Sequence, residues 1–285
     1  MNLTFSTKDE YKRIRRQLEP FWGIQEADSI TFMLFEHFYQ IKRNDILTDK
    51  QIEVSKEVEQ KLKQSLNRLE RKEPIQYILG STEFSGFHFK ISKEVLIPRS
   101  ETEELVDLIV RENKVKEPKV IDIGTGSGCI AVSLAKLIPG ASIIAIDIDE
   151  NAINLARENA AFNHVDLTFL QSDILSDNIP GSEFDIVVSN PPYVQQSERN
   201  LLDENVLKYE PDKALFVPDD NPLIFYTVIA RKAKPKIKHN GFLYFEINEV
   251  FGHEICDLLY KEGYRHIKLF YDINNKPRII QANNN

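Results

Sequence analysis

The stretch Lys119-Val-Ile-Asp-Ile-Gly-Thr-Gly-Ser-Gly-Cys-Ile-Ala131 decides the fold of this chain. Residues 120–123 form a short apolar run, which is typical of a strand buried on both faces of a parallel sheet. Three glycines follow within residues 124–128, and a helix is predicted to begin at about Cys129. Such a loop lets a ligand approach the backbone closely and points the first amides of the helix at it. A dinucleotide site usually places its third glycine one position later, so the spacing departs from the nicotinamide fingerprint.

The next two predicted strands each end near an acidic residue. Residues 142–147 close on Asp147, whose carboxylate can accept both hydroxyl protons of a ribose. Residues 167–171 lead to Asp173, which could accept from an adenine amine, and to Ile174, which could cover the ring. Each acid taken alone is more often a helix cap or a solvated turn residue. Together with the glycine loop, in this order, they indicate a nucleoside site.

A second informative stretch is Asp185-Ile-Val-Val-Ser-Asn-Pro-Pro-Tyr-Val194. Its apolar run predicts another buried strand, and its two prolines, which lack an N–H and have a fixed φ, predict a stiff extended turn after it. The side-chain carbonyl of Asn190 and the backbone carbonyl of Pro191 then stand as two acceptors beside the ring of Tyr193. A planar NH₂ group fits this arrangement. By itself the stretch is equally compatible with an ordinary Asn-Pro turn that closes a core strand.

Composition limits the class of protein. The 285 residues suit one large and one small domain, and 42% hydrophobic residues suffice for a sizeable core. The 44 acidic and 36 basic residues argue against a partner held mainly through phosphates. Cys129 and Cys256 indicate neither a disulfide framework nor a zinc site, and no signal peptide or membrane span is expected. We therefore expect a cytoplasmic protein that binds no metal and contacts no membrane.

Residues outside these stretches predict the rest of the architecture. Helices expected near residues 6–18, 26–42 and 56–71 make a bundle over residues 1–73, which either selects a partner or only stabilises the protein. Residues 74–99 read as a linker with a β-hairpin. The remaining residues, 100–285, are expected to form an α/β domain that ends in an antiparallel hairpin.

Two side chains at the start of that domain have structural interpretations. Ser100 and Glu103 have the spacing of a capping box for the helix that begins there. Arg99 precedes the helix and is expected to be a solvated surface residue, with a carboxylate partner as the less favoured alternative. Glu246, at the end of a predicted strand, either faces the cleft or has a buried, hydrogen-bonded role.

These motifs resemble those of class I methyltransferases that use S-adenosyl-L-methionine, and Asn-Pro-Pro-Tyr resembles the subset that methylates planar NH₂ groups. Within that subset the chain is similar to the family of protein-(glutamine-N(5)) methyltransferases that act on bacterial peptide chain release factors. The likeness covers nearly the whole chain, through residues in the segments 73–84, 97–103, 209–216 and 246–247 and at Arg278.

The resemblance implies a Rossmann-like domain with a mostly parallel sheet, a small N-terminal helical bundle, and a linking hairpin. It also implies that S-adenosyl-L-methionine is the cofactor and that release factors are the partners, with no direct binding of nucleic acid. The cofactor is expected to contact Gly124, Thr125, Gly126, Ser127, Gly128, Asp147, Asp173, Ile174 and Asn190. Asn190, Pro191, Pro192 and Tyr193 are expected to hold the substrate glutamine, with Asn190, Pro191 and Tyr193 as the catalytic set.

The chain departs from the family pattern at three places. Ser100 replaces a proline, Ile174 replaces a frequently aromatic residue, and residues 219–222 replace a glycine-rich turn. None of these changes touches Asn190 or the glycine loop.

Two rival functions follow from the same motifs. A methyltransferase acting on an exocyclic amine of a nucleic-acid base would suit Asn-Pro-Pro-Tyr, but it would need a flipped base and a basic track. An adenosyl-binding interaction module without catalysis would use the bundle as its working surface. Turnover on a release factor, on ribosomal RNA, or on neither would separate the three hypotheses.

Overall fold

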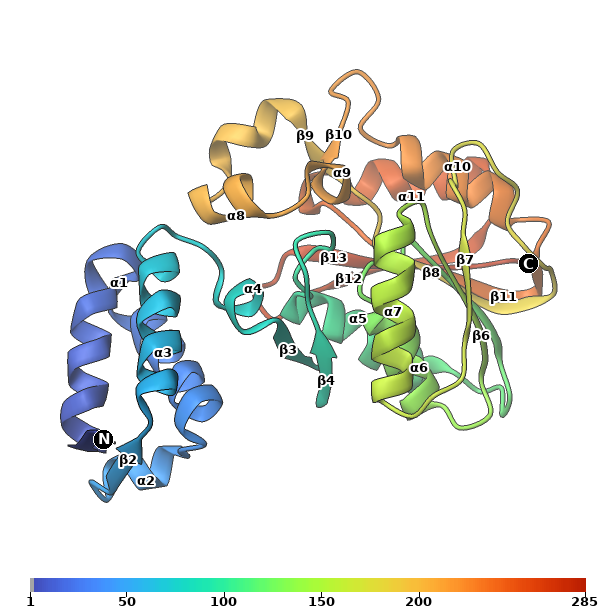
Figure 1. The fold of residues 1–285 in the computed structure, drawn as a ribbon. Coiled ribbons are helices and arrows are strands. Elements are labelled where there is room, and N and C mark those ends of the chain that lie inside the picture. The colour runs from blue at the N-terminus through green and yellow to red at the C-terminus, as the bar shows by residue number, and fades with distance from the viewer. Residues whose placement is uncertain (1–2) are drawn as a thin grey trace. The chain divides into compact units, whose positions relative to one another are not determined.

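The computed structural model of the protein describes residues 3–285, which fold into two compact units (Figure 1). The first unit comprises the residues up to Gly80 together with Glu204–Tyr209, and the second comprises Ser81–Asp203 and Glu210–Asn285. The hairpin that the sequence analysis placed in a linker therefore belongs to the second unit. No helix in the described part of the chain is long and apolar enough to cross a membrane.

The first unit is helical with one small sheet. Its elements are β1 (Leu3–Ser6), α1 (Thr7–Tyr39), α2 (Arg43–Leu47), β2 (Gln51–Val54), α3 (Lys56–Leu69), α4 (Ile75–Leu79) and α8 (Glu204–Tyr209). Ser6 caps α1 by accepting from the Asp9 amide, and a kink at Gly23 divides α1 into the two helices that the sequence indicated. The predicted apolar stripes meet in one core that includes Ile14, Leu18, Ile30, Leu34, Leu62, Leu66 and Leu69.

The antiparallel pair of β1 and β2 was not predicted from the sequence.

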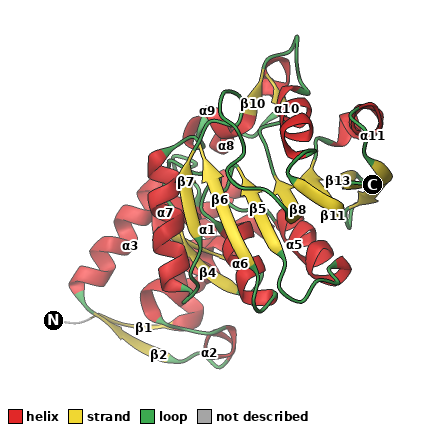
Figure 2. Ribbon diagram, turned by 90° about the vertical axis from the view of Figure 1, so that its right-hand side faces the viewer, coloured by secondary structure: helices red, strands yellow, loops and turns green. Residues whose placement is uncertain are grey.

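The second unit is built on a seven-stranded sheet with the order β12-β13-β11-β8-β5-β6-β7 (Figure 2). Its strands are β5 (Lys119–Ile123), β6 (Ser142–Asp147), β7 (Thr168–Gln171), β8 (Phe184–Ser189), β11 (Ile237–Glu246), β12 (Arg265–Tyr271) and β13 (Pro277–Asn283). Strands β7, β6, β5, β8 and β11 are parallel, and β13 pairs antiparallel with β11 and β12. The predicted mostly parallel Rossmann-like sheet with a closing antiparallel hairpin is confirmed.

Helices and short segments complete this unit. The helices are α5 (Ser100–Glu112), α6 (Cys129–Leu137), α7 (Glu150–Phe162), α9 (Asp212–Leu215), α10 (Ile224–Ala233) and α11 (Gly252–Lys261). The short elements are the hairpin of β3 (Ser81–Phe84) and β4 (Phe87–Lys90), the parallel pair of β9 (Val194–Gln195) and β10 (Phe216–Val217), and the 3₁₀ turns Gln196–Leu201 and Glu249–Phe251. The hairpin of β3 and β4 lies within residues 74–99, where the sequence predicted one.

The strand order places the ligand site. The chain runs from β5 outward to β6 and β7, and then returns to β8 on the other side of β5. Open α/β sheets bind ligands at such a reversal, outside the carboxyl ends of the strands. Ile123, the last residue of β5, pairs with Ser189, the last residue of β8, and the Ser189 hydroxyl donates to the Ile123 carbonyl at 2.6 Å. The glycine loop and the Asn-Pro-Pro-Tyr turn thus leave the sheet side by side.

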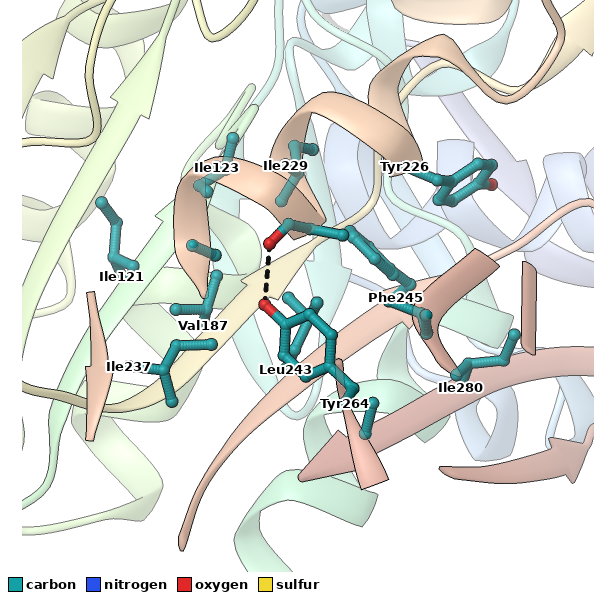
Figure 3. Close-up of a cluster of buried hydrophobic side chains, with 14 of the residues drawn as sticks. Ile121, Ile123, Val187, Tyr226, Ile229, Ile237, Leu243, Phe245, Tyr264 and Ile280 are labelled. Atoms are coloured by element: carbon teal, nitrogen blue, oxygen red, sulfur yellow. Dashed lines mark hydrogen bonds between the residues drawn. The ribbon is translucent and has the colours of Figure 1, made fainter. Parts of the chain in front are cut away.

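A dense core keeps these strand ends in place. Ile121, Val187, Leu243 and Phe245 from three neighbouring strands are fully buried with side chains of α10 and α11 (Figure 3). The Tyr264 hydroxyl within this core donates to the Ala230 carbonyl at 2.9 Å, the hydrogen bond drawn in Figure 3. Because packed interiors deform little, the sheet is a rigid base for both loops.

Two predictions at the start of α5 are wrong. Arg99, not Ser100, is the N-cap residue, and no side chain caps the helix. Glu103 instead accepts from the Ser85 backbone amide in the hairpin turn at 2.8 Å, a tertiary partner that spacing along the helix cannot reveal. Arg99 is not merely solvated, since it pairs with the buried carboxylate of Glu210 at 2.6 Å.

Candidate active site

A cavity of about 290 Å³ opens at the carboxyl ends of β5, β6, β7 and β8, within the second unit. The predicted site residues that line it are Gly124, Thr125, Gly126, Ser127, Asp147, Asp173, Ile174, Asn190, Pro191 and Pro192. Gly128 and Tyr193 are predicted site residues outside this lining. The structure therefore gathers residues from four strand ends around one space that suits a small molecule.

The glycine loop follows the backbone conformation that its glycines permit. Gly124 and Gly126 have φ values of 77° and 54°, which L-residues with a side chain rarely adopt. A Cβ at either position would meet no atom within 4 Å, so the space beside the loop is open to a ligand. Gly128, with φ of 80°, has a different reason: a Cβ there would lie 3.0 Å from the Cβ of Ala156 on α7. It allows α6 to begin close against its neighbour.

Asp147 ends β6 with its carboxylate at the cavity. Its Oδ2 accepts from the Gly126 amide at 2.8 Å, and its Oδ1 accepts from the Asp149 amide at 3.0 Å. Burial raises the pKa of Asp147, despite these two amide bonds. A carboxylate with two oxygens holds further lone pairs, and a partly desolvated one gains from additional hydroxyl donors. The two hydroxyl groups of a ribose are donors that would suit these remaining acceptor sites.

Asp173 and Ile174 lie at the same cavity but differ in character. Ile174 is buried, with 9% of its surface exposed, and offers an apolar wall beside Ile148 and Ala152. The Asp173 carboxylate is already used locally, accepting from the Leu175 amide at 2.9 Å and from the Ser176 hydroxyl at 3.3 Å. The structure thus supports an apolar contact with a ring more directly than an acceptor at Asp173.

Two buried polar residues that hold the glycine loop were missed by the sequence analysis. Asp122, inside β5, accepts from the Thr125 hydroxyl at 2.6 Å, and burial raises its pKa to about 7. Asn159 of α7 donates to the Ser127 carbonyl at 2.8 Å and also bonds the backbone of Lys90. The only signal in the sequence was a polar residue within an apolar strand and one on the apolar face of a helix.

Another part of the cavity wall is the turn after β8. Asn190 is partly buried and its Nδ2 donates to the Thr102 hydroxyl at 3.2 Å, so its Oδ1 is turned away from Thr102. Pro191 and Pro192 line the cavity and restrict the turn. Tyr193 packs partly buried against the core, and its hydroxyl donates to Glu246 at 3.3 Å. Its ring therefore supports the turn from behind the lining.

Two ion pairs tie the segment around α9 to the rest of the unit. Arg99 pairs with Glu210, which also accepts from the Ile97 amide at 3.4 Å. Lys213 pairs with Asp149, the residue that caps α7. Arg99, Lys213 and Asp149 all line the cavity, so these pairs close its rim.

The chain is similar to known proteins over most of its length. Residues 11–80 match the PrmC N-terminal domain family, and residues 101–209 match the Methyltransferase small domain family. The release factor glutamine methyltransferase of Flavobacterium psychrophilum is 43% identical over 263 residues, 91% of this chain and 92% of that protein. The protein of the same name from Bacteroides thetaiotaomicron is 42% identical over 271 residues, 95% and 97% of the two chains.

A solved structure agrees with the fold. The crystal structure of a methyltransferase from Pyrococcus furiosus matches 70% of this chain and 89% of its own, with a TM-score of 0.52 and 16% identity. At that identity the likeness speaks for the fold alone.

Proposed function

The chain belongs to the release factor glutamine methyltransferase family, and from this membership we infer its reaction. It is an enzyme that transfers a methyl group from S-adenosyl-L-methionine to the side-chain amide nitrogen of the glutamine in the Gly-Gly-Gln motif of peptide chain release factors, and so modulates translation termination. The fold of the second unit is that of a class I methyltransferase.

The residues around the cavity fit the cofactor. Asp147 supplies a desolvated acceptor for ribose hydroxyls, and the open side of the loop at residues 124–128 admits a ligand close to the backbone. Ile174 supplies an apolar wall. We propose that these groups hold S-adenosyl-L-methionine, together with Thr125, Ser127, Asp173 and Asn190. When bound, the cofactor supplies an electrophilic methyl carbon.

One observation supports the substrate assignment more than any other. The Asn190 amide is held with Nδ2 on Thr102, in the same cavity as the glycine loop and Asp147. Its Oδ1 and the Pro191 carbonyl then serve as acceptors for the two hydrogens of a carboxamide. With Pro192 and Tyr193 stiffening the turn, we propose that residues 190–193 grip the substrate glutamine.

The chemistry expected of these acceptors is placement and charge stabilisation. An amide nitrogen is a weak nucleophile because its lone pair is delocalised into the carbonyl. Asn190 and Pro191 orient that nitrogen, and alignment of reacting groups contributes several kcal/mol. The same acceptors stabilise positive charge as it develops on the nitrogen, an interaction that strengthens toward the transition state.

The first unit supports a proposal about the partner. Its residues 11–80 match a family domain of their own. Because the cavity and its lining belong to the second unit, we propose that the bundle contributes to release factor recognition and not to chemistry. The proposed domain limits are 1–73 for the bundle, 74–99 for the linker and 100–285 for the methyltransferase domain.

Charge and thiol content support two further expectations. The excess of acidic over basic residues, 44 against 36, favours a protein partner over a nucleic-acid backbone. Both cysteines are free thiols, which suits a reducing cytoplasmic location.

Mass analysis of the Gly-Gly-Gln peptide tests the function. A purified release factor incubated with the enzyme and S-adenosyl-L-methionine should gain one methyl group on the glutamine, while ribosomal RNA under the same conditions gains none. Methylation of RNA with an unmodified release factor would overturn the assignment and favour the nucleic-acid rival. Asn190→Ala protein should fold, bind cofactor and leave the peptide unmodified.

A further inference from the structure

A chain of hydrogen bonds lies behind Asn190 and joins three elements that are far apart in the sequence. Asn190, in the turn after β8, donates from Nδ2 to the hydroxyl of Thr102 at 3.2 Å. Thr102, in the first turn of α5, donates in turn to Oε2 of Glu246 at 2.6 Å. Glu246 is the last residue of β11, the neighbour of β8 in the sheet. The orientation of the Asn190 amide is thus linked to a carboxylate that does not line the cavity.

Glu246 holds the other end of the turn as well. Its Oε1 accepts from the Tyr193 hydroxyl at 3.3 Å, so one carboxylate bonds both Thr102 and Tyr193. The backbone carbonyl of Glu246 accepts from the Tyr226 hydroxyl at 3.2 Å, which anchors the strand end in the core. Glu246 and Thr102 are 1% and 3% exposed, so water does not compete for these bonds.

The chemistry of the three groups dictates the polarity of the chain. An ionised carboxylate has no hydrogen and can only accept, so the Thr102 hydroxyl must donate its single hydrogen to Glu246. The Thr102 oxygen is then only an acceptor toward Asn190, which must present its NH₂. The remaining end of the carboxamide, Oδ1, is turned the other way. A substrate NH₂ group needs an acceptor, and an Asn190 in the reversed orientation would oppose it with another NH₂.

We propose that Glu246 and Thr102 are positioning residues that hold the Asn190 carboxamide with Oδ1 toward the substrate, and thereby select an NH₂ group as methyl acceptor. Neither residue is assigned contact with the reacting atoms. The inference rests on the proposed role of Asn190 in glutamine methylation and adds the source of its orientation.

The surroundings of Glu246 make this arrangement sensitive to pH. Burial raises the pKa of Glu246 to about 6, and Glu101 of α5 also raises it, while the bonds from Thr102 and Tyr193 and the charge of Arg278 on β13 lower it. Cys129 and Tyr226, the other titratable groups that interact with Glu246, have raised pKa values and are neutral at pH 7. Protonated Glu246 no longer requires the Thr102 hydrogen, which then becomes free to bond Asn190 Oδ1.

The first test removes the relay at Thr102. Thr102→Val keeps the shape of the side chain but deletes the hydroxyl, and it should lower kcat/KM for a release factor by about 10- to 100-fold, the usual cost of losing a partner that orients a ligand group. The cofactor Kd should stay within about 3-fold, because Asn190 is only one of the several residues proposed to hold the cofactor and the others are untouched. Thr102→Ser restores the hydroxyl and should recover most of the loss.

Ser133→Ala is the matched control for removal of a buried hydroxyl. Ser133 lies in α6, fully buried, and its hydroxyl has no hydrogen-bond partner among the described residues. This variant should retain wild-type kcat/KM. A purely structural role of Thr102 predicts instead a lower Tm with equal kcat/KM in the folded fraction, and that result would overturn the proposal.

The second test uses the pH profile and does not depend on the Thr102 variants being stable. Wild-type kcat/KM should fall below an apparent pKa near 6 as Glu246 takes up a proton. Glu246→Gln cannot ionise, so that acid limb should disappear and activity at pH 8 should be reduced. An unchanged limb in Glu246→Gln would exclude Glu246 as its source and contradict the proposal.

The outcomes separate this inference from the proposed function. If the wild-type enzyme does not methylate a release factor, the function itself is wrong. If the wild type methylates it, Asn190→Ala does not, and Thr102→Val matches the wild type, then only the positioning role fails.

Discussion

The two loops that leave β5 and β8 lie side by side but are constructed in opposite ways. The loop after β5 depends on its main chain, because Gly124 and Gly126, both with positive φ, leave room beside the backbone. The turn after β8 depends on side chains, because two prolines restrict it and hydrogen bonds orient Asn190 and Tyr193. The difference agrees with the proposed roles, since a loop that holds a cofactor needs space for close approach, whereas a turn that holds a substrate amide needs one polar group in one orientation.

This contrast has consequences for mutation. Single polar side chains on the cofactor side should contribute modest, separable amounts of binding energy. On the substrate side a single truncation should remove the chemistry and leave cofactor binding intact.

The largest effect is expected at Asn190. Asn190→Ala removes the only side-chain acceptor assigned to the substrate amide and should lower kcat by roughly 1,000-fold, at the upper end of the loss for one preorganised polar group. Steady-state methylation of a release factor measures kcat, and calorimetric titration measures the cofactor Kd, which should change by less than about 5-fold. A comparable loss in both quantities would break the distinction between the two loops.

The buried Asp122, which bonds Thr125 of the glycine loop, should change how the free energy of unfolding depends on pH. The pKa of Asp122 is raised by burial from its ordinary value of 3.8 to about 7, so between these values the native state binds more protons than the unfolded state. Stability contributed by this group is therefore lost as pH rises. The free energy of unfolding of Asp122→Asn minus that of the wild type should therefore rise by roughly 2 to 3 kcal/mol from pH 5 to pH 8.

Urea denaturation at the two pH values measures this gain. The amide retains an acceptor for the Thr125 hydroxyl, so the loop should keep its shape. A constant difference in free energy of unfolding between variant and wild type across the range would contradict a folded pKa of about 7 for Asp122.

A smaller effect is expected at Asp147. Asp147→Asn keeps one acceptor but loses the charge, and hydrogen bonds to a charged group contribute about 1.5 to 3 kcal/mol. The cofactor Kd should therefore rise about 10- to 100-fold, while kcat at saturating cofactor stays close to wild type. A fall in kcat with unchanged Kd would place Asp147 on the substrate side of the comparison.

The smallest effect is expected at the rim. Lys213 pairs with Asp149, and the lysine side chain is 52% exposed, so the pair is solvent-screened. Lys213→Ala should raise the cofactor Kd by at most about 5-fold, which corresponds to about 1 kcal/mol. If the variant bound the cofactor more than about 5-fold more weakly at low ionic strength and normally in high salt, the rim would act on the cofactor through long-range charge.

The features that could be predicted from the sequence are those that depend on residues close together in the chain. The glycine loop, the stiff Asn-Pro-Pro-Tyr turn and the buried strands follow from backbone φ limits, the absence of an N–H in proline, and runs of apolar residues. These are local constraints, and the structure confirms the strands, the parallel sheet and the hairpins that they predicted.

Only the tertiary structure decided which polar groups meet. Thr102 is separated from Asn190 by 88 positions and from Glu246 by 144, and the three come together through the register of parallel strands and the packing of α5. The same reason explains the errors at Arg99 and Glu103, whose partners Glu210 and Ser85 lie 111 and 18 positions away. A hydrogen bond depends on a distance in space, and local periodicity carries no information about that distance.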